Sequence, residues 1–112
     1  MKEIRAVIRP EKLQDVLSAL EKVGCNGIMV SEVEGHGAQK GITHQWRGEK
    51  YTLDLLPKKL LSIVAKDKDA DMIKNAIIKV ARVGEVGDGK IFISTVEEVV
   101  RIRTGDTNDE AL

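Results

Sequence analysis

Apolar and polar residues alternate near the start of the chain, and this pattern predicts a strand over residues 3–9 with one buried face. The spacing then lengthens to the 3.6-residue period of an amphipathic helix over residues 11–23. Its apolar positions are Leu13, Val16, Leu17, Leu20 and Val23. Pro10 can begin this helix, and Gly24 can end it because glycine tolerates a positive φ. A second strand is expected to begin with Ile28, Val30 and Val33.

The second half of the chain repeats this order of elements. Residues 60–65 predict a strand, and residues 67–71 offer N-cap candidates and early negative charge for a second helix. The apolar stripe of that helix consists of Met72, Ile73, Ala76, Ile77 and Val80. The segment KIFIST, which starts at Lys90, predicts a closing strand.

The order strand–helix–strand, strand–helix–strand predicts an α+β fold of the ferredoxin-like class. In this double split βαβ sandwich, the helices cover one face of an antiparallel sheet. The 112 residues suit one small core, so residues 1–112 are expected to form a single domain. Val7, with Ile63 or Val64, is expected on the other face, where no predicted helix is left to cover it. A further copy of the chain is therefore expected there.

A long exposed loop is expected between the second and third strands, over residues 36–54. The segment 34–53 contains four glycines and no sustained apolar period. Loops of this length are uncommon in small domains unless they are functional or disordered. A tolerated flexible insertion is the alternative. However, Trp46 and Tyr51, the single tryptophan and single tyrosine of the chain, both lie here. Their position favours a recognition loop.

Composition narrows the function classes. Lys plus Arg and Asp plus Glu both total 18, so the net charge is zero, whereas general nucleic-acid binding requires a basic face. No apolar stretch approaches the roughly 20 residues that span a bilayer, and the charged first residues do not resemble a signal peptide. Cys25 is the single cysteine and cannot form an internal disulfide. We therefore expect a cytoplasmic protein that neither binds nucleic acid nor inserts into a membrane.

The segment GEVGDGK, residues 84–90, joins the second predicted helix to the last strand and is a candidate anion site. Three glycines within six residues let backbone amides approach an anion closely, and Lys90 can neutralise its charge. The spacing is not that of a Walker A motif, and neither Ser nor Thr follows the lysine. A tight glycine-rich turn with a solvated lysine is the alternative.

The segment RIRTG, residues 101–105, places Arg101 and Arg103 two positions apart. In an extended segment both side chains would project to the same side and could clamp a phosphate chain. The alternative is a solvated edge strand whose arginines deter aggregation.

Five segments, taken in order and with their spacing, resemble the PII nitrogen-regulatory signal proteins over the whole chain. They are GHGAQKG, WRGEKY, LLPK, GEVGDGKIF and VVRIRTGD. The resemblance implies a homotrimer of ferredoxin-like subunits with nucleotide sites at the subunit clefts. It also implies a regulator rather than an enzyme. Such a protein senses ATP or ADP and 2-oxoglutarate and acts on ammonium transporters or nitrogen-metabolism enzymes through its long loop.

The same resemblance assigns site residues. The nucleotide-binding positions are Gly35, Gly37, Gln39, Val64, Gly87, Asp88, Gly89, Lys90, Arg101 and Arg103, with the two arginines supplied by a neighbouring subunit. Gln39 and Lys58 match the positions that hold 2-oxoglutarate, and Gln39 also matches the position near a Mg²⁺ ion carried by ATP and 2-oxoglutarate. Tyr51 matches the loop tyrosine that a nucleotidyltransferase uridylylates or adenylylates in some family members.

Several positions depart from the family pattern. Met29 and Val83 stand where threonine is usual, Ser62 where glutamate is usual, and Ala38 where many members have arginine. Trp46 replaces a frequent tyrosine. Loss of these polar groups predicts weaker nucleotide binding, because each hydrogen bond contributes about 0.5–1.5 kcal/mol. The alternative function is therefore a diverged regulator with altered effector specificity, or one specialised for a target such as nitrogenase.

Two other function classes fit the predicted fold less well. An acylphosphatase-like hydrolase can share it, but the sequence offers neither a nucleophile–base pair nor paired carboxylates on facing elements. RNA binding of the RRM type needs aromatic side chains on the sheet, and Phe92 is the single aromatic residue in a predicted strand. A regulatory function is favoured over both.

Overall fold

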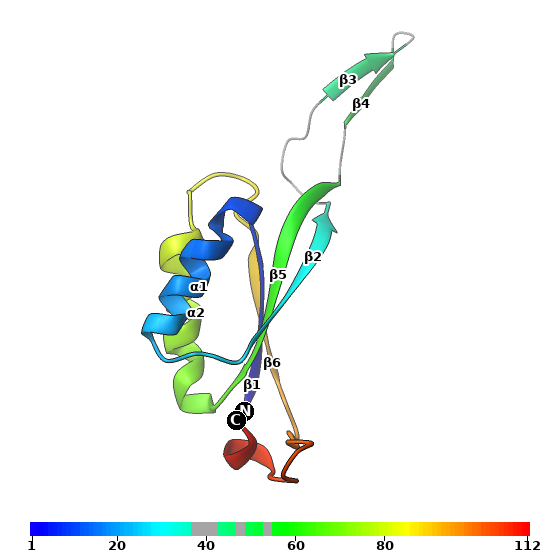
Figure 1. Cartoon of the computed structure of the whole chain (residues 1–112). Helices are drawn as coiled ribbons and strands as arrows, with labels where there is room; N and C mark the ends of the chain where they lie inside the picture. The colour runs from blue at the N-terminus through cyan, green and yellow to red at the C-terminus, as the bar shows by residue number, and fades with distance from the viewer. Residues whose placement is uncertain (37–42, 47–48, 53–54) are drawn as a thin grey trace.

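The computed structural model describes residues 1–36, 43–46, 49–52 and 55–112, with side chains described outside residues 37–54. Two α-helices lie on one face of a four-stranded antiparallel sheet (Figure 1). The helices are α1 (Leu13–Lys22) and α2 (Asp67–Ala81), and the strands are β1 (Lys2–Ile8), β2 (Ile28–Gly35), β5 (Leu56–Ala65) and β6 (Lys90–Thr95). The sheet order β2-β5-β1-β6 confirms the predicted ferredoxin-like α+β fold.

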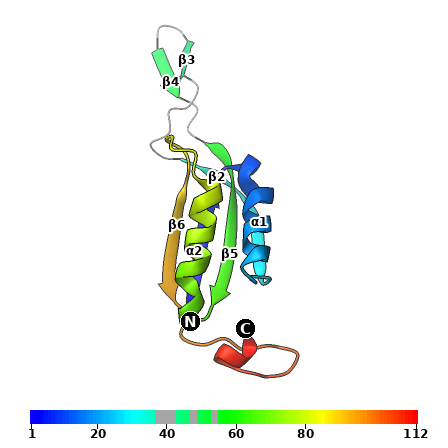
Figure 2. The same ribbon diagram turned by 90° about the vertical axis from the view of Figure 1, so that its left-hand side faces the viewer.

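The core lies between the sheet and the helices. Ile4, Ala6 and Ile8 of β1 are at most 2% exposed, as the alternating pattern predicted. Ile4 pairs with Ile63 of β5, and Ala6 pairs with Leu61, so the same face continues across the sheet. Figure 2 shows α1 and α2 side by side over this face.

Both helices follow their predicted apolar stripes with small differences. A 3-10 turn, η1 (Pro10–Lys12), precedes α1, and Gly24 ends the helical segment with a φ of 83°. The helix α2 begins at Asp67, and its N-cap is Lys66, whose side chain makes no cap hydrogen bond. The prediction of an N-cap within residues 67–71 was therefore wrong. Asp67 instead lies in the first turn and pairs with the amino group of Met1 at 2.8 Å.

The strand β5 begins at Leu56, four residues before the predicted start at residue 60. Pro57, Lys58 and Lys59 interrupt the apolar run there, which hid the strand in the sequence. The pairing of β5 with β1 stops at Lys59, whereas Pro57 pairs with β2. One side of β5 therefore needs no ladder hydrogen bond at Pro57, which makes a proline acceptable.

The segment between β2 and β5 contains a second, two-stranded sheet. Its strands are β3 (Thr43–Trp46) and β4 (Glu49–Thr52), which pair from Thr43 with Thr52 to Trp46 with Glu49. Figure 1 shows this hairpin beyond the ends of β2 and β5. Regular structure thus occurs inside the segment that was expected as a loop. These strands were not predicted, because the segment has no sustained apolar period and a hairpin does not need one.

The sheet face away from the helices carries apolar side chains. Val7 and Val64 are half-buried there, and Phe92 of β6 is 52% exposed. Of the two residues considered for this face, Val64 lies on it, while Ile63 belongs to the core. In the described part of the chain, both α-helices lie on the other side of the sheet and leave this face uncovered (Figure 1). We call it the open face.

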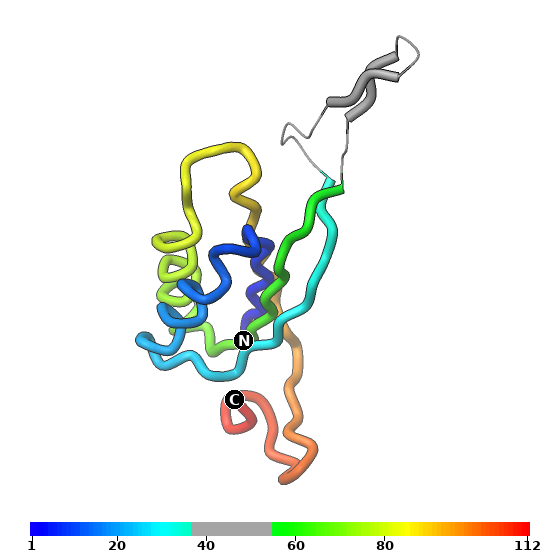
Figure 3. Tube along the Cα trace, turned by 45° about the horizontal axis from the view of Figure 1, so that its top comes forward, coloured from blue at the N-terminus to red at the C-terminus, as the bar shows by residue number. Residues whose placement is uncertain are grey.

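The chain termini lie at the same end of the sheet (Figure 3). There, the amide of Val96 donates to the carbonyl of Met1 at 3.1 Å. The residues after β6 form a turn, an isolated bridge between Val100 and Thr107, and the 3-10 helix η2 (Asn108–Ala111). No described helix combines the length and the apolar character that crossing a bilayer requires.

Candidate functional site

The glycine-rich loop, residues 82–89, leaves α2 and enters β6 at the end of the sheet opposite the termini. Gly84, Gly87 and Gly89 have φ values of 94°, 102° and 97°, which other residues rarely adopt. A Cβ atom on Gly89 would lie 1.8 Å from the carbonyl oxygen of Val7. The loop backbone therefore rests directly on the end of β1, and this position requires glycine.

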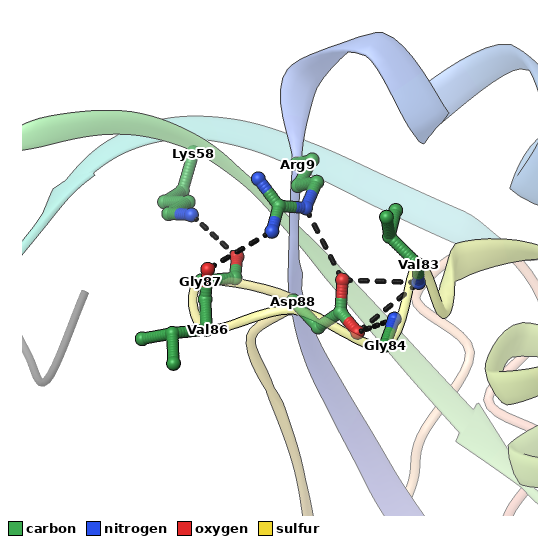
Figure 4. Close-up of polar contacts among 7 residues, drawn as sticks. All are labelled: Arg9, Lys58, Val83, Gly84, Val86, Gly87 and Asp88. Atoms are coloured by element: carbon green, nitrogen blue, oxygen red, sulfur yellow. Dashed lines mark hydrogen bonds and ion pairs between the residues drawn. The ribbon is translucent and has the colours of Figure 1, made fainter. Parts of the chain in front are cut away.

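The carboxylate of Asp88 closes this loop upon itself (Figure 4). The amide of Val83 donates to both carboxylate oxygens at 3.1 Å, and the amide of Gly84 donates to one of them at 2.8 Å. The Gly84 bond, together with those from Val83 and Arg9, holds the pKa of Asp88 below its ordinary value. Asp88 is thus a negatively charged acceptor for its own loop.

Arg9 follows β1 directly and holds the loop at two points. Its Nε donates to Asp88 at 3.2 Å, and its Nη2 donates to the carbonyl of Val86 at 3.0 Å. The side chain is 16% exposed. Arg9 was not predicted as a functional residue, because a basic residue at the end of the predicted strand looks the same as a solvated charge.

Lys58 approaches the loop from β5. Its side chain is almost buried, and Nζ donates to the carbonyl of Gly87 at 2.7 Å (Figure 4). Burial, and next the charge of Arg9, lower the pKa of Lys58. Gly35 of β2 lies beside it, since a Cβ there would be 3.2 Å from Lys58 Cγ. The structure thus brings together Gly35, Lys58 and the loop with Asp88.

Other predicted nucleotide residues lie at the opposite end of the sheet. Val64 is six residues further along β5 than Lys58, a separation of about 20 Å in a strand. It lines a pocket of about 560 Å³ with Met29 and Ser62, two of the positions that depart from the family pattern. The hydroxyl of Ser62 donates to Glu3 at 3.1 Å.

The arginines of the C-terminal segment also lie at that end, because β6 runs from Lys90 to Thr95 before reaching them. The amide of Gly105 donates to the carbonyl of Arg101 at 2.7 Å, which closes a turn. The expectation of an extended segment with both arginines on one side was therefore wrong. Arg101 pairs with Asp106 at 3.2 Å and donates to the carbonyl of Glu110, while Arg103 is exposed in the turn.

Three predicted functional positions fall in the segment between β2 and β5. Gly37 and Gln39 lie outside the described residues, and so does the assignment of Gln39 to 2-oxoglutarate and Mg²⁺. Tyr51 belongs to β4, where it pairs with His44 of β3, but its side chain is outside the described part. The described predicted residues form two groups, one at each end of the sheet.

The chain matches the family model for "Nitrogen regulatory protein P-II" over residues 1–106. Together with the ferredoxin-like fold, this match places the chain in the P-II family of nitrogen regulatory proteins, which confirms the resemblance found in the sequence. It is 55% identical over 112 residues to "Nitrogen regulatory protein P-II 2" of Methanothermobacter thermautotrophicus, covering all of this chain and 97% of that relative. The P-II proteins of Microchaete diplosiphon and Rhizobium meliloti are 54% and 49% identical, with full coverage of both chains.

Proposed function

We propose that this chain is a PII-type signal protein that senses ATP or ADP and 2-oxoglutarate and regulates nitrogen-metabolism proteins through residues 36–54. The observation that carries the proposal is the glycine-rich loop, which rests on β1 with the ammonium group of Lys58 beside it. Backbone amides of glycines at positive φ, next to a cation, favour an anionic ligand. The relatives named above are regulatory proteins, which supports signalling rather than catalysis.

The residues present suit the ligands that the family resemblance implies. Residues 87–90 would hold the phosphates of the nucleotide, because the backbone of residues 87–89 and the first residue of β6, Lys90, follow one another directly at the end of the sheet. Lys58 would pair with a carboxylate of 2-oxoglutarate, and Gln39 would contact 2-oxoglutarate near Mg²⁺. A Mg²⁺ ion binds phosphate and keto-acid oxygens, so it would make the two ligands bind cooperatively.

The two groups of predicted nucleotide residues support a site between neighbouring copies, and the family resemblance implies that the copies form a homotrimer. A single nucleotide would not span the roughly 20 Å between Lys58 and Val64 along β5. It could contact the glycine-rich loop of one copy and the group containing Val64, Arg101 and Arg103 of the next. The apolar side chains on the open face offer a surface for that association.

Regulation would act through direct protein contact in the cytoplasm. Ammonium transporters or nitrogen-metabolism enzymes are the proposed targets, and Tyr51 is the proposed site of modification by a nucleotidyltransferase. Tyr51 lies in strand β4 of the hairpin, and this position is compatible with contact to a target protein and with modification of the tyrosine.

A diverged regulator with altered effector specificity, or one devoted to a target such as nitrogenase, is the second candidate. It is favoured by the pocket around Val64, where Met29 replaces a usual threonine and is 64% exposed. Ser62 replaces a usual glutamate there and already donates its hydroxyl to Glu3. A base bound in this pocket would meet different polar groups from those of the common pattern.

Calorimetric titration with ATP at fixed Mg²⁺, with and without 2-oxoglutarate, separates these candidates. We expect ATP to bind, and 2-oxoglutarate to bind only when ATP is present. Lys58→Met should abolish 2-oxoglutarate binding while ATP still binds, and Lys79→Met, on the exposed side of α2, should change neither. ATP binding that is indifferent to 2-oxoglutarate would instead support the diverged regulator.

A further inference from the structure

We propose that Arg9 is a positioning residue of the nucleotide site, which neutralises Asp88 and so allows the glycine-rich loop to accept a polyphosphate. This inference rests on the proposed function of the loop. It assigns Arg9 no contact with the nucleotide. Its role is exerted through Asp88 and Val86, the two loop residues that its guanidinium contacts.

The loop has an electrostatic difficulty as an anion site, because Asp88 lies within it. Its pKa is lowered, so the carboxylate carries a full negative charge near neutral pH. A carboxylate beside a phosphate chain would repel it, most strongly where water is partly excluded. The structure turns this carboxylate toward the amides of Val83 and Gly84 and toward Arg9, so its charge is balanced within the protein (Figure 4).

Arg9 is suited to this task by shape as well as by charge. Its planar guanidinium donates from Nε to Asp88 and from Nη2 to the carbonyl of Val86, so one side chain fixes two points of the loop. The side chains of Arg9 and Asp88 are 16% and 25% exposed. A partly buried pair is screened less than a fully exposed ion pair.

Lys58 acts on the loop at a different point, although its charge also attracts Asp88. Its Nζ donates to the carbonyl of Gly87 rather than to the carboxylate of Asp88. Arg9 directly follows the buried Ile8, so its backbone is held in place by the core. The backbone at Gly89 rests on Val7 of the same strand. The end of β1 therefore positions the loop twice, through a backbone contact and through Arg9.

The test measures Kd for AMP, ADP and ATP with the full chain and its variants Arg9→Met, Asp88→Asn and the double variant. Arg9→Met should weaken ATP binding about tenfold, the effect of one lost charge-assisted hydrogen bond. The loss should be smaller for ADP and smallest for AMP, because repulsion by the exposed carboxylate grows with ligand charge. Asp88→Asn should restore much of the affinity in the Arg9→Met background. The control Lys79→Met removes the same charge from α2 and should change each Kd less than twofold.

A second measurement follows loop order without any nucleotide. Hydrogen exchange at the amides of Val83 and Gly84 should accelerate in Arg9→Met, while exchange at Ile77 in the core of α2 stays unchanged and shows that the chain is folded. Arg9→Lys keeps the charge but replaces the separate Nε and Nη2 donors, which reach Asp88 and Val86, with a single nitrogen. It should therefore give an intermediate exchange rate and an intermediate Kd for ATP.

The possible results distinguish the inference from the function on which it rests. If the unaltered chain binds no nucleotide, the proposed function fails and the role of Arg9 fails with it. If the unaltered chain binds but Arg9→Met loses the same factor for AMP, ADP and ATP, the inference alone is overturned. Failure of Asp88→Asn to restore affinity in the Arg9→Met background would also overturn it, because neutralisation of that carboxylate is its central claim.

Discussion

Gly84 and Gly89 belong to the same loop and have φ values of 94° and 97°, but their surroundings differ. A Cβ on Gly89 would meet the carbonyl of Val7 at 1.8 Å, whereas nothing lies within 4 Å of a Cβ on Gly84. Gly89→Ala should therefore destabilise the fold by more than the roughly 1–3 kcal/mol expected from backbone strain alone. Gly84→Ala, the matched control, should cost no more than that strain. Urea unfolding measures both, and equal losses would contradict the close approach at Gly89.

Lys58 should make 2-oxoglutarate binding sensitive to alkaline pH. Burial and the charge of Arg9 lower the pKa of Lys58 from its ordinary value of 10.5, so its neutral form appears at a lower pH than in an exposed lysine. Affinity for 2-oxoglutarate, measured at saturating ATP, should therefore fall as pH rises through this lowered pKa. Lys58→Arg keeps its charge at high pH and should show little of this decline. An equal decline in both proteins would assign the pH effect to another group.

For single residues, the glycines and charges of the site could be predicted from the sequence, but the contacts between them could not. Three glycines and Lys90 in one short segment predicted an anion loop. That Asp88 turns back to the amides of Val83 and Gly84 depends on the loop conformation, which no periodic pattern reveals. The contact between Arg9 and Asp88 joins residues 79 positions apart, so local sequence contains no trace of it.

Among the elements, those that bury one face were the most predictable. Alternation identified β1, and the 3.6-residue period identified α1 and α2, because burial imposes the spacing of apolar residues. The start of β5 was missed because Pro57 is acceptable there only through the particular pairing of β5. The turn at residues 101–105 was missed because its closing bond, from Gly105 to Arg101, involves backbone atoms rather than side-chain type.

Two residues of the predicted apolar stripe of α2 differ in how far they are buried. Ile77 is 1% exposed, whereas Met72 is 44% exposed. Ile77→Ala should lower the free energy of unfolding by about 2–5 kcal/mol, because it leaves a cavity between α2 and the sheet. Met72→Ala should lower it by less than about 1 kcal/mol. Chemical denaturation of both variants tests the placement of the helix, and a large loss for Met72 would contradict it.

For the whole molecule, the open face is the feature with a direct test. Phe92→Asp places a charge on this face, so the proposed trimer should dissociate toward a mass of 12.3 kDa in light scattering. Asn75→Asp places the same charge on the exposed side of α2, on the other side of the sheet, and should leave the mass unchanged. Phe92→Asp should also lose ATP binding if the site lies between copies. If the unaltered chain is monomeric and binds ATP, this result would contradict a nucleotide site between copies.

The pairing of Gly35 with Leu56 has a consequence for how such a protein can diversify. These two residues hold both ends of the intervening segment as neighbours in the sheet, so the sheet does not depend on how many residues connect them. Closing a longer connection costs little, about 0.6 kcal/mol for each doubling of its length. The segment can therefore be exchanged or lengthened over evolutionary time with a small effect on folding. New surface contacts can then be acquired while the core of the sheet and helices is inherited unchanged.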